Sequence, residues 1–384
     1  MEAITQCKIY SSITLKENKV SAFKTYTTLN TSLKNRFAVA PMTRVSADKN
    51  GTIGEKVCQY YSAYANGGFG LIITEGLYTD KEYSQGYLHQ PGIATPEQVE
   101  SWKPAVRCMH DNDAVAIAQL MHAGALSQFN QYKSEAAGPS SVKPKGRKMP
   151  FYYGQGEFSV PKALSITQID TVINGFVQSA INAKEAGFDG VEVHGANGYL
   201  LDQFLTDYTN TRTDQYGGSL ENRTRLIKEI IAAIRLATGN DFIVGIRFSQ
   251  KKVNDTEHFW AEAEELAEIA FTAAEDAGAD YIHTTEPVAN QSAFNNDSLP
   301  MAQLAKKYTD LTVIANGSIN SQELANEILN AGIADLVAIG KTALANQDMP
   351  KKLQERKPLN EFDFAMLAPI ANLECAEQFL KQSN

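Results

Sequence analysis

The sequence predicts an α/β protein built as a single (β/α)8 barrel of the TIM type. Eight short apolar runs, rich in β-branched residues, recur along the chain, as expected of parallel strands that are buried on both faces. Stretches with helical periodicity lie between the runs, and a glycine-containing junction that ends in Asp precedes several of them. Strands that alternate with helices form parallel sheets, and eight such units are enough to close a barrel.

Each predicted strand is flanked by polar or glycine-containing segments. A doubly wound open sheet is the alternative fold, but it would place a GxGxxG phosphate loop after the first strand. Here the first strand is followed by Pro41-Met42-Thr43-Arg44, which disfavours the open sheet. The eight predicted strands are Phe37–Ala40, Leu71–Thr74, Ala114–Leu120, Gly190–His194, Ile243–Phe248, Tyr281–Thr284, Leu311–Ala315 and Leu336–Ile339.

The clearest predicted helix covers Val172–Ala186, where apolar residues recur with helical spacing. Thr167 and Asp170 resemble a capping box at its start. Gly187 suits the position just after its end, because glycine adopts the left-handed backbone that terminates many helices.

Composition narrows the classes of function. The formal net charge of the 384-residue chain is −9, which argues against broad nucleic-acid binding, since phosphates are neutralised by basic residues. The four cysteines include no CxxC pair and the six histidines no HxH or HExxH, so no metal site is predicted. Scattered cysteines, no signal peptide and no apolar stretch of membrane-spanning length together predict a cytoplasmic protein.

Three parts of the chain are distinguished. Residues 1–21 form a Ser/Thr/Lys-rich N-terminal extension, expected either to be disordered or to lie across one end of the domain. Residues 22–384 are expected to form the catalytic barrel. Within it, residues 128–161 are a long insertion after the third strand, basic at Lys143–Lys148 and aromatic at Phe151-Tyr152-Tyr153. Insertions of this length commonly cover an active site, so we expect a lid whose basic and aromatic residues receive the nicotinamide nucleotide, with a solvated hairpin as the alternative.

Polar residues gather where the predicted strands end, and in a (β/α)8 barrel these ends surround the active site. Arg247 lies within a buried strand and needs an anion or a hydrogen-bonding ligand to offset its desolvation. His194, Asn197 and Tyr199 fall close together at one strand end, where a ligand would satisfy them. Four other polar residues, taken singly, are expected to be satisfied within the fold: His122, His283, Glu75 and Ser318.

The loops after the seventh and eighth strands are the usual phosphate-binding loops of such barrels. Gly317 and Gly340 would let backbone N–H groups approach a phosphate, and Lys341 adds a positive charge. Many sugar-phosphate enzymes share this pattern. By itself it therefore predicts only a phosphorylated ligand.

The segment Gly187–Arg223, with the sequence GFDGVEVHGANGYLLDQFLTDYTNTRTDQYGGSLENR, closely resembles a signature of the old yellow enzyme family. The resemblance extends from about Phe23 to Met349. It implies an FMN-binding barrel that takes hydride from NADPH or NADH and reduces the activated C=C bond of α,β-unsaturated carbonyl or nitro compounds. Further matching motifs occur in the family's order: LKNRFAVAPMTR (Leu33–Arg44), AQLMHAG (Ala118–Gly124), GIRFS (Gly245–Ser249), ANGSI (Ala315–Ile319) and IGKTALANQD (Ile339–Asp348).

The resemblance also implies a role for each candidate residue. Thr43 would hydrogen-bond the flavin C4 carbonyl, and Arg247 would stabilise the negative charge of reduced flavin near N1. His194 and Asn197 would bind the substrate oxygen, and Tyr199 would donate the proton. The other implied cofactor-binding residues are Pro41, Met42 and Gly76 along the ring, Gln119 at the pyrimidine edge, and Gly317, Ser318, Gly340 and Lys341 at the phosphate.

Two features depart from the family's pattern. Lys341 stands where the family usually has Arg, so a bidentate phosphate contact becomes a point charge and we expect weaker FMN retention. The stretch Asn360–Asn384 lacks the aromatic-rich run of many relatives, which puts one wall of the cavity, or a dimer contact, in question. The expected partners are the small-molecule substrate and the coenzyme, without nucleic acid or membrane, for a monomer or homodimer.

Two other functions stay open. A phosphosugar isomerase or aldolase barrel would share Gly317 and Gly340, but it needs a glutamate base or a Schiff-base lysine inside the barrel. A non-catalytic FMN-binding protein would hold the flavin without turnover.

Overall fold

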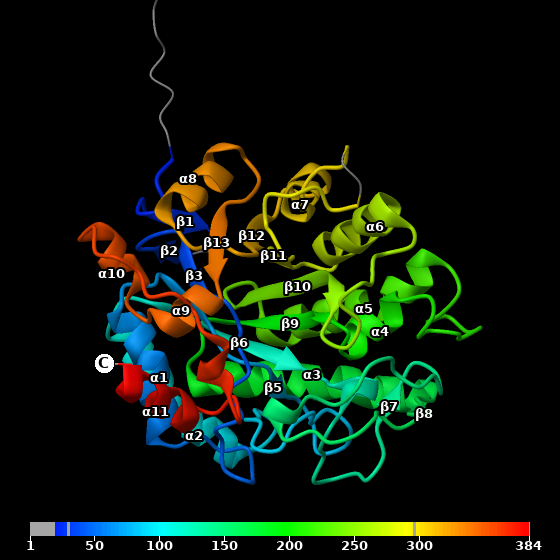
Figure 1. Cartoon of the computed structure of the whole chain (residues 1–384). Helices are drawn as coiled ribbons and strands as arrows, with labels where there is room; N and C mark the ends of the chain where they lie inside the picture. The colour runs from blue at the N-terminus through cyan, green and yellow to red at the C-terminus, as the bar shows by residue number, and fades with distance from the viewer. Residues whose placement is uncertain (1–19, 29–30, 295–296, 384) are drawn as a thin grey trace, which may run out of the picture.

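A closed barrel of parallel strands forms the centre of the computed structural model, which describes residues 20–28, 31–294 and 297–383 (Figure 1). Strand β3 pairs with both β13 and β4, and β4 pairs with β6, so the barrel strands leave no free edge among themselves. All eight predicted strands are barrel strands, which confirms the (β/α)8 fold. They are β3 Phe37–Val39, β4 Leu71–Ile73, β6 Val115–Met121, β9 Gly190–Asn197, β10 Ile243–Lys252, β11 Tyr281–Thr285, β12 Thr312–Asn316 and β13 Leu336–Ile339.

Helices fill the connections between the barrel strands and form the outer layer (Figure 1). No described helix is long and apolar enough to cross a membrane. The α-helices are α1 Glu55–Asn66, α2 Pro96–His110, α3 Ile166–Ala186, α4 Leu200–Leu205, α5 Leu220–Thr238, α6 Ala263–Asp276, α7 Met301–Tyr308, α8 Gln322–Asn330, α9 Lys341–Ala345, α10 Met349–Gln354 and α11 Leu373–Ser383. The remaining elements are β1 Tyr26–Thr28, β2 Thr31–Leu33, β5 Leu77–Tyr78, β7 Ala137–Gly138, β8 Lys162–Ala163, η1 Gly124–Leu126, η2 Pro150–Tyr152 and η3 Phe364–Leu367.

The start of α3 differs from the prediction. Ser165, not Thr167, is the N-cap: its side chain accepts from the backbone of Gln168, whose side chain accepts from the Ser165 backbone. The predicted capping box of Thr167 and Asp170 is therefore wrong. The same type of pattern occurs two residues earlier, and the helix begins there. The predicted end is confirmed, because Gly187 has a φ of +97°.

Side chains that alternate along the strands fill the barrel interior. In β4, Leu71 and Ile73 belong to the inner cluster, whereas Ile72 belongs to the cluster between the barrel and the helices. Leu33, at the end of the β1–β2 hairpin, packs against the inner cluster. The hairpin thus covers the N-terminal end of the barrel and leaves the C-terminal end for a binding site.

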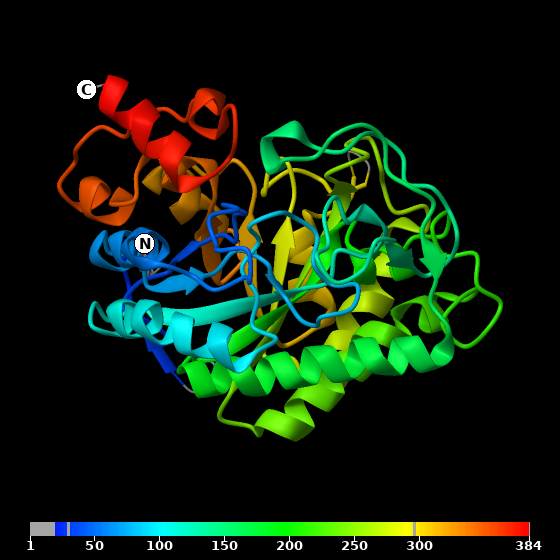
Figure 2. The same ribbon diagram turned by 90° about the horizontal axis from the view of Figure 1, so that it is seen from below.

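Two segments cover the C-terminal end. Figure 2 shows the insertion at residues 128–161 and the C-terminal segment at the end toward which the barrel strands point. The backbone N–H of Ala371 donates to the carbonyl of Phe151 at 2.9 Å, which joins the two segments. Helix α11 packs against α1. The function of the insertion as a lid stays a prediction.

Most of the predicted N-terminal extension, residues 1–19, lies outside the described residues. Where the described chain begins, the Val20 N–H donates to Asn330 Oδ1 at 2.7 Å. The Ala22 N–H donates to Asn326 Oδ1 at 2.8 Å. Both asparagines belong to α8, so the chain enters the barrel along this helix.

Candidate active site

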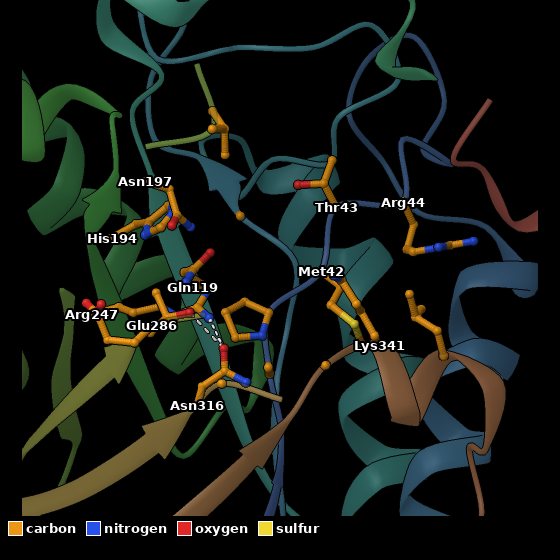
Figure 3. Close-up of a pocket in the computed structure, with 18 of the residues that line it drawn as sticks. Met42, Thr43, Arg44, Gln119, His194, Asn197, Arg247, Glu286, Asn316 and Lys341 are labelled. Atoms are coloured by element: carbon orange, nitrogen blue, oxygen red, sulfur yellow. Dashed lines mark hydrogen bonds between the residues drawn. The ribbon is translucent and has the colours of Figure 1, made fainter. Parts of the chain in front are cut away.

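A cavity of about 400 Å³ opens at the C-terminal ends of the barrel strands (Figure 3). The loops and strand ends that surround it come from sequence segments far apart in the chain. Every residue that the sequence suggested for the site lines this one cavity: Pro41, Met42, Thr43, Gly76, Gln119, His194, Asn197, Tyr199, Arg247, Gly317, Ser318, Gly340 and Lys341.

Arg247 of β10 brings a buried cation to the cavity. Its Nη2 donates to Asn316 Oδ1 at 3.0 Å, whereas its buried Nε has no hydrogen-bond partner in the described part of the chain. Burial lowers the pKa of Arg247 to about 10, and the carboxylate of Glu192 opposes this shift. The guanidinium is therefore charged at neutral pH, and its Nε–H is left for a ligand.

Glu192 lies inside the barrel and organises the residues beneath the cavity. Its carboxylate accepts from Gln119 Nε2 at 2.8 Å, from the Tyr281 hydroxyl at 3.0 Å and from His283 Nδ1 at 2.9 Å. Burial alone would raise the pKa of Glu192, but His283, Arg247 and Gln119 outweigh it and lower the pKa. The Gln119 amide is thereby fixed with its oxygen available to a ligand.

His194 and Asn197 of β9 point into the same part of the cavity (Figure 3). Burial and the charge of Arg247 lower the pKa of His194 to about 3, so the imidazole is neutral at physiological pH. The buried His194 Nδ1 has no hydrogen-bond partner among the residues that the structure describes. The two side chains therefore offer neutral N–H donors toward the cavity.

Tyr199 is the N-cap residue of α4 and places its phenol at the cavity wall. The hydroxyl is hydrogen-bonded to that of Tyr87, and the ring centroid lies 5.1 Å from that of His194. Burial raises the pKa of Tyr199, and the hydroxyl contact with Tyr87 opposes the shift. The phenol is therefore protonated at neutral pH and can donate a proton.

The predicted phosphate-binding residues also line the cavity, and Lys341 lies on the side opposite His194 and Asn197 (Figure 3). Gly317 has a φ of +155°, and a Cβ there would lie 2.4 Å from the Glu286 carbonyl oxygen, so only glycine fits. The Ser318 hydroxyl donates to the Pro287 carbonyl at 2.7 Å. The Lys341 ammonium lies 4.9 Å from the ring centroid of Phe364, beside the cavity.

Several lining residues were not among the candidate site residues, although Tyr152 belongs to the aromatic stretch of the predicted lid. Tyr152 comes from the insertion, and Phe362 and Leu367 come from the C-terminal segment, which supplies part of the wall that the sequence left in question. Glu286 follows β11, and burial raises its pKa to about 7. Its position after a barrel strand was a signal that the sequence offered. The other three lie on segments that reach the cavity only through tertiary contacts.

Of the four polar residues expected to be satisfied within the fold, three lie outside the cavity and one lines it. His283 contacts Glu192, His122 Nδ1 accepts from the Gly124 N–H at 3.1 Å, and Glu75 accepts from the Arg44 N–H at 2.8 Å. These three do not line the cavity. Ser318 does line it, although its hydroxyl has a partner in the fold.

Two lysines in the basic stretch of the insertion form ion pairs. Lys145 forms an ion pair with Asp255 at 2.8 Å, and Lys143 forms one with Glu157 at 2.6 Å. Neither Arg147 nor Lys148 has an ion pair within the described ranges.

The sequence model of the NADH:flavin oxidoreductase / NADH oxidase family matches residues 21–360. The chain belongs to this family. Among curated relatives, 12-oxophytodienoate reductase 2 of Arabidopsis thaliana is 35% identical over 344 residues, covering 86% of this chain and 87% of the relative. Putative 12-oxophytodienoate reductase 5 of Oryza sativa subsp. japonica is 36% identical over 341 residues, covering 86% of each chain.

Solved structures give the same assignment. The old yellow enzyme homologue from Zymomonas mobilis superposes with a TM-score of 0.81 at 29% identity, covering 89% of this chain and 94% of the other. Morphinone reductase in complex with tetrahydroNAD superposes with a TM-score of 0.79 at 31% identity, covering 90% and 93%. Membership in the old yellow enzyme family is thus confirmed. The chain is an FMN-dependent oxidoreductase that uses a nicotinamide coenzyme and reduces activated C=C bonds.

The residues around the cavity fit FMN. The unpartnered Nε of the buried Arg247 suits an acceptor that gains negative charge on reduction. The free oxygen of Gln119 suits a ring N–H. Gly317 allows the close backbone approach that a phosphate requires.

Proposed function

We propose that this cavity binds FMN together with an α,β-unsaturated carbonyl or nitro compound, and that Tyr199 protonates the substrate as its C=C bond is reduced. One observation carries the proposal. Two neutral N–H donors, those of His194 and Asn197, lie beside the protonated Tyr199 phenol in one cavity.

The cofactor would be held at both ends of the cavity. Arg247 and Gln119 would contact the pyrimidine edge, and Thr43 would hydrogen-bond the C4 carbonyl. The backbone of Gly76, which lines the cavity, would lie along the ring. A Cβ there would lie 2.5 Å from Met121 Sδ, so the position requires glycine. The other residues assigned to the cofactor are Pro41 and Met42 at the ring and Gly317, Ser318, Gly340 and Lys341 at the phosphate.

When bound, FMN would supply hydride transfer from the nicotinamide coenzyme to the substrate β-carbon. Negative charge then develops on the substrate oxygen, where His194 and Asn197 would donate hydrogen bonds. Loss of one such donor lowers the rate of a well-studied hydrolase by about 10²–10³-fold. Tyr199 would give its hydroxyl proton to the α-carbon.

An absorption spectrum tests the proposal directly. The purified protein should show a flavin spectrum, lose it anaerobically with NADPH and regain it with 2-cyclohexenone. A colourless protein that does not take up added FMN would contradict the proposal and favour a phosphosugar barrel. Flavin that is bound but never reoxidised by the enone would indicate a non-catalytic FMN-binding protein.

We also propose a cytoplasmic monomer or homodimer without nucleic-acid partners. The net charge of −9 and the scattered cysteines support this. In the same proposal, residues 22–384 form one catalytic barrel, residues 128–161 form its lid and residues 1–21 are an extension. Light scattering of the purified chain, cell fractionation and removal of residues 1–19 would test these points.

A further inference from the structure

The turn between Asn197 and Tyr199 has an unusual backbone. Asn197 has a φ of +61° and Gly198 a φ of +88°, so two consecutive residues are left-handed. Positive φ is uncommon for non-glycine residues, although asparagine adopts it more often than most, and contacts from the surroundings help to hold it. A Cβ on Gly198 would lie 2.8 Å from Asn254 Oδ1, so a neighbouring segment touches the turn. The conformation thus depends on contacts from outside the turn.

Asp202 of α4 provides one of these contacts. Its Oδ2 accepts from the buried Gly198 N–H at 2.5 Å. Its Oδ1 accepts from the Lys252 ammonium at 2.6 Å, and the same ammonium donates to Thr206 Oγ1 at 2.7 Å. The side chains of Lys252 and Asp202 are 2% and 0% exposed. A buried ammonium persists only with partners, and here both partners lie directly after the turn.

Strand β10 brings Lys252 to this place. It pairs regularly with β9 as far as Phe248, after which the register shifts and Lys252 pairs with Asn197. The Asn197 N–H donates to Ser249 Oγ at 2.8 Å, and its carbonyl accepts from the Val253 N–H at 3.1 Å. The irregular end of β10 therefore binds Asn197 on both sides of its backbone, as bulges beside active sites commonly do.

We propose that Lys252 is a positioning residue for substrate binding. Through Asp202, its ammonium holds the Gly198 turn so that the Asn197 amide and the Tyr199 phenol face the cavity together. Lys252 does not line the cavity and so acts only through the turn. The inference rests on the proposed roles of Asn197 and Tyr199.

The test compares Lys252→Met with a matched control, Lys251→Met. The Lys251 ammonium lies over the Phe259 ring, 3.3 Å from its centroid, and is not part of this network. One measurement is the dissociation constant of 4-hydroxybenzaldehyde, a phenol whose oxygen would accept from His194 and Asn197. The other is reoxidation of the dithionite-reduced holoenzyme, by 2-cyclohexenone and by ferricyanide, an acceptor that needs no bound carbonyl.

We expect Lys252→Met to weaken phenol binding and to slow reoxidation by the enone about tenfold or more, since small displacements of reacting groups have effects of this size. Ferricyanide reoxidation and the Lys251→Met control should match the wild type. A flavin-loaded Lys252→Met protein with wild-type phenol binding would overturn the proposal.

A second variant keeps the test decisive if Lys252→Met does not fold. Thr206→Val removes one acceptor of the ammonium and retains the ion pair, and it should raise the phenol dissociation constant by a smaller factor. An unchanged constant would overturn the proposal. Asn197→Ala distinguishes failure of the Lys252 proposal from failure of the proposed function. If Asn197→Ala also leaves phenol binding unchanged, the proposed function itself fails.

Discussion

Replacing Tyr199 with Phe removes one hydroxyl from the cavity and leaves the ring in place. The side chain is 4% exposed and packs against His194 and Tyr87, so the fold should tolerate the change. The lost hydroxyl contact with Tyr87 is worth about 0.5–1.5 kcal/mol of the free energy of unfolding. The catalytic effect should be much larger, because a positioned general acid contributes about 10²–10⁴-fold in rate.

Stopped-flow measurements of the two half-reactions separate these effects. Reduction of the bound flavin by NADPH requires no proton from Tyr199 and should proceed at the wild-type rate in Tyr199→Phe. Reoxidation by 2-cyclohexenone should slow by about 10²–10⁴-fold. Equal losses in both half-reactions would show that Tyr199 supports the structure of the site and is not the acid.

Tyr87→Phe is the matched control. It removes the same hydroxyl contact but keeps the Tyr199 phenol. Enone reduction should then change far less than in Tyr199→Phe. A comparable loss in both variants would attribute the effect to the hydrogen bond, and the assignment of Tyr199 as proton donor would be refuted.

Four further predictions concern single features of the site. Lys341→Arg should tighten FMN binding about tenfold by adding a bidentate phosphate contact, worth about 1.4 kcal/mol; an unchanged dissociation constant of FMN would refute this. Asn197→Ala should weaken binding of phenols and enones while FMN stays bound, and loss of FMN would mean that the site is misassigned. The pKa of His194 is about 3 in the folded chain and about 6.5 in the unfolded chain. Between about pH 3 and about pH 6.5 the unfolded chain therefore binds one proton more than the folded chain. The His194 contribution to the free energy of unfolding should therefore fall as the pH drops from about 6.5 to about 3, and His194→Asn should flatten this acid limb in urea titrations. Replacing Arg147 and Lys148 together should raise KM for NADPH more than KM for the enone; equal effects would exclude a coenzyme role for the insertion.

The sequence alone determined the barrel and which candidate residues line the cavity at its C-terminal end. Buried parallel strands appear as apolar runs, and a polar residue at the end of such a run, such as Arg247 or His194, stands out against them. Since the ends of all barrel strands meet at one face, the candidate residues could be assigned to a single cavity before any contact was known. The sequence also suggested Gly317 as a residue that lets the backbone approach a phosphate; its backbone excludes a side chain, and the phosphate role stays a prediction.

Only the tertiary structure decided which partners these residues contact. Glu192 is a charged residue within a predicted strand, but the sequence does not show its partners; in the barrel it contacts Gln119 and His283 and fixes the Gln119 amide. Tyr152 and Phe362 reach the cavity from segments far apart in the chain. The local pattern around α3 was also ambiguous, because two overlapping sets of residues suited a capping box.

The buried pair of Lys252 and Asp202 shows most clearly why such contacts could not be predicted from the sequence. Lysine and aspartate ordinarily lie at the surface, and nothing local in the sequence indicates that these two are buried. The register shift between β9 and β10 places Lys252 beside Asn197, and helix α4 brings Asp202 to it, so the pair forms only when segments far apart in the chain meet. Periodicity and residue type are local properties that can be read from the sequence. Which side chains form hydrogen bonds and ion pairs depends on distances that exist only once the barrel has closed.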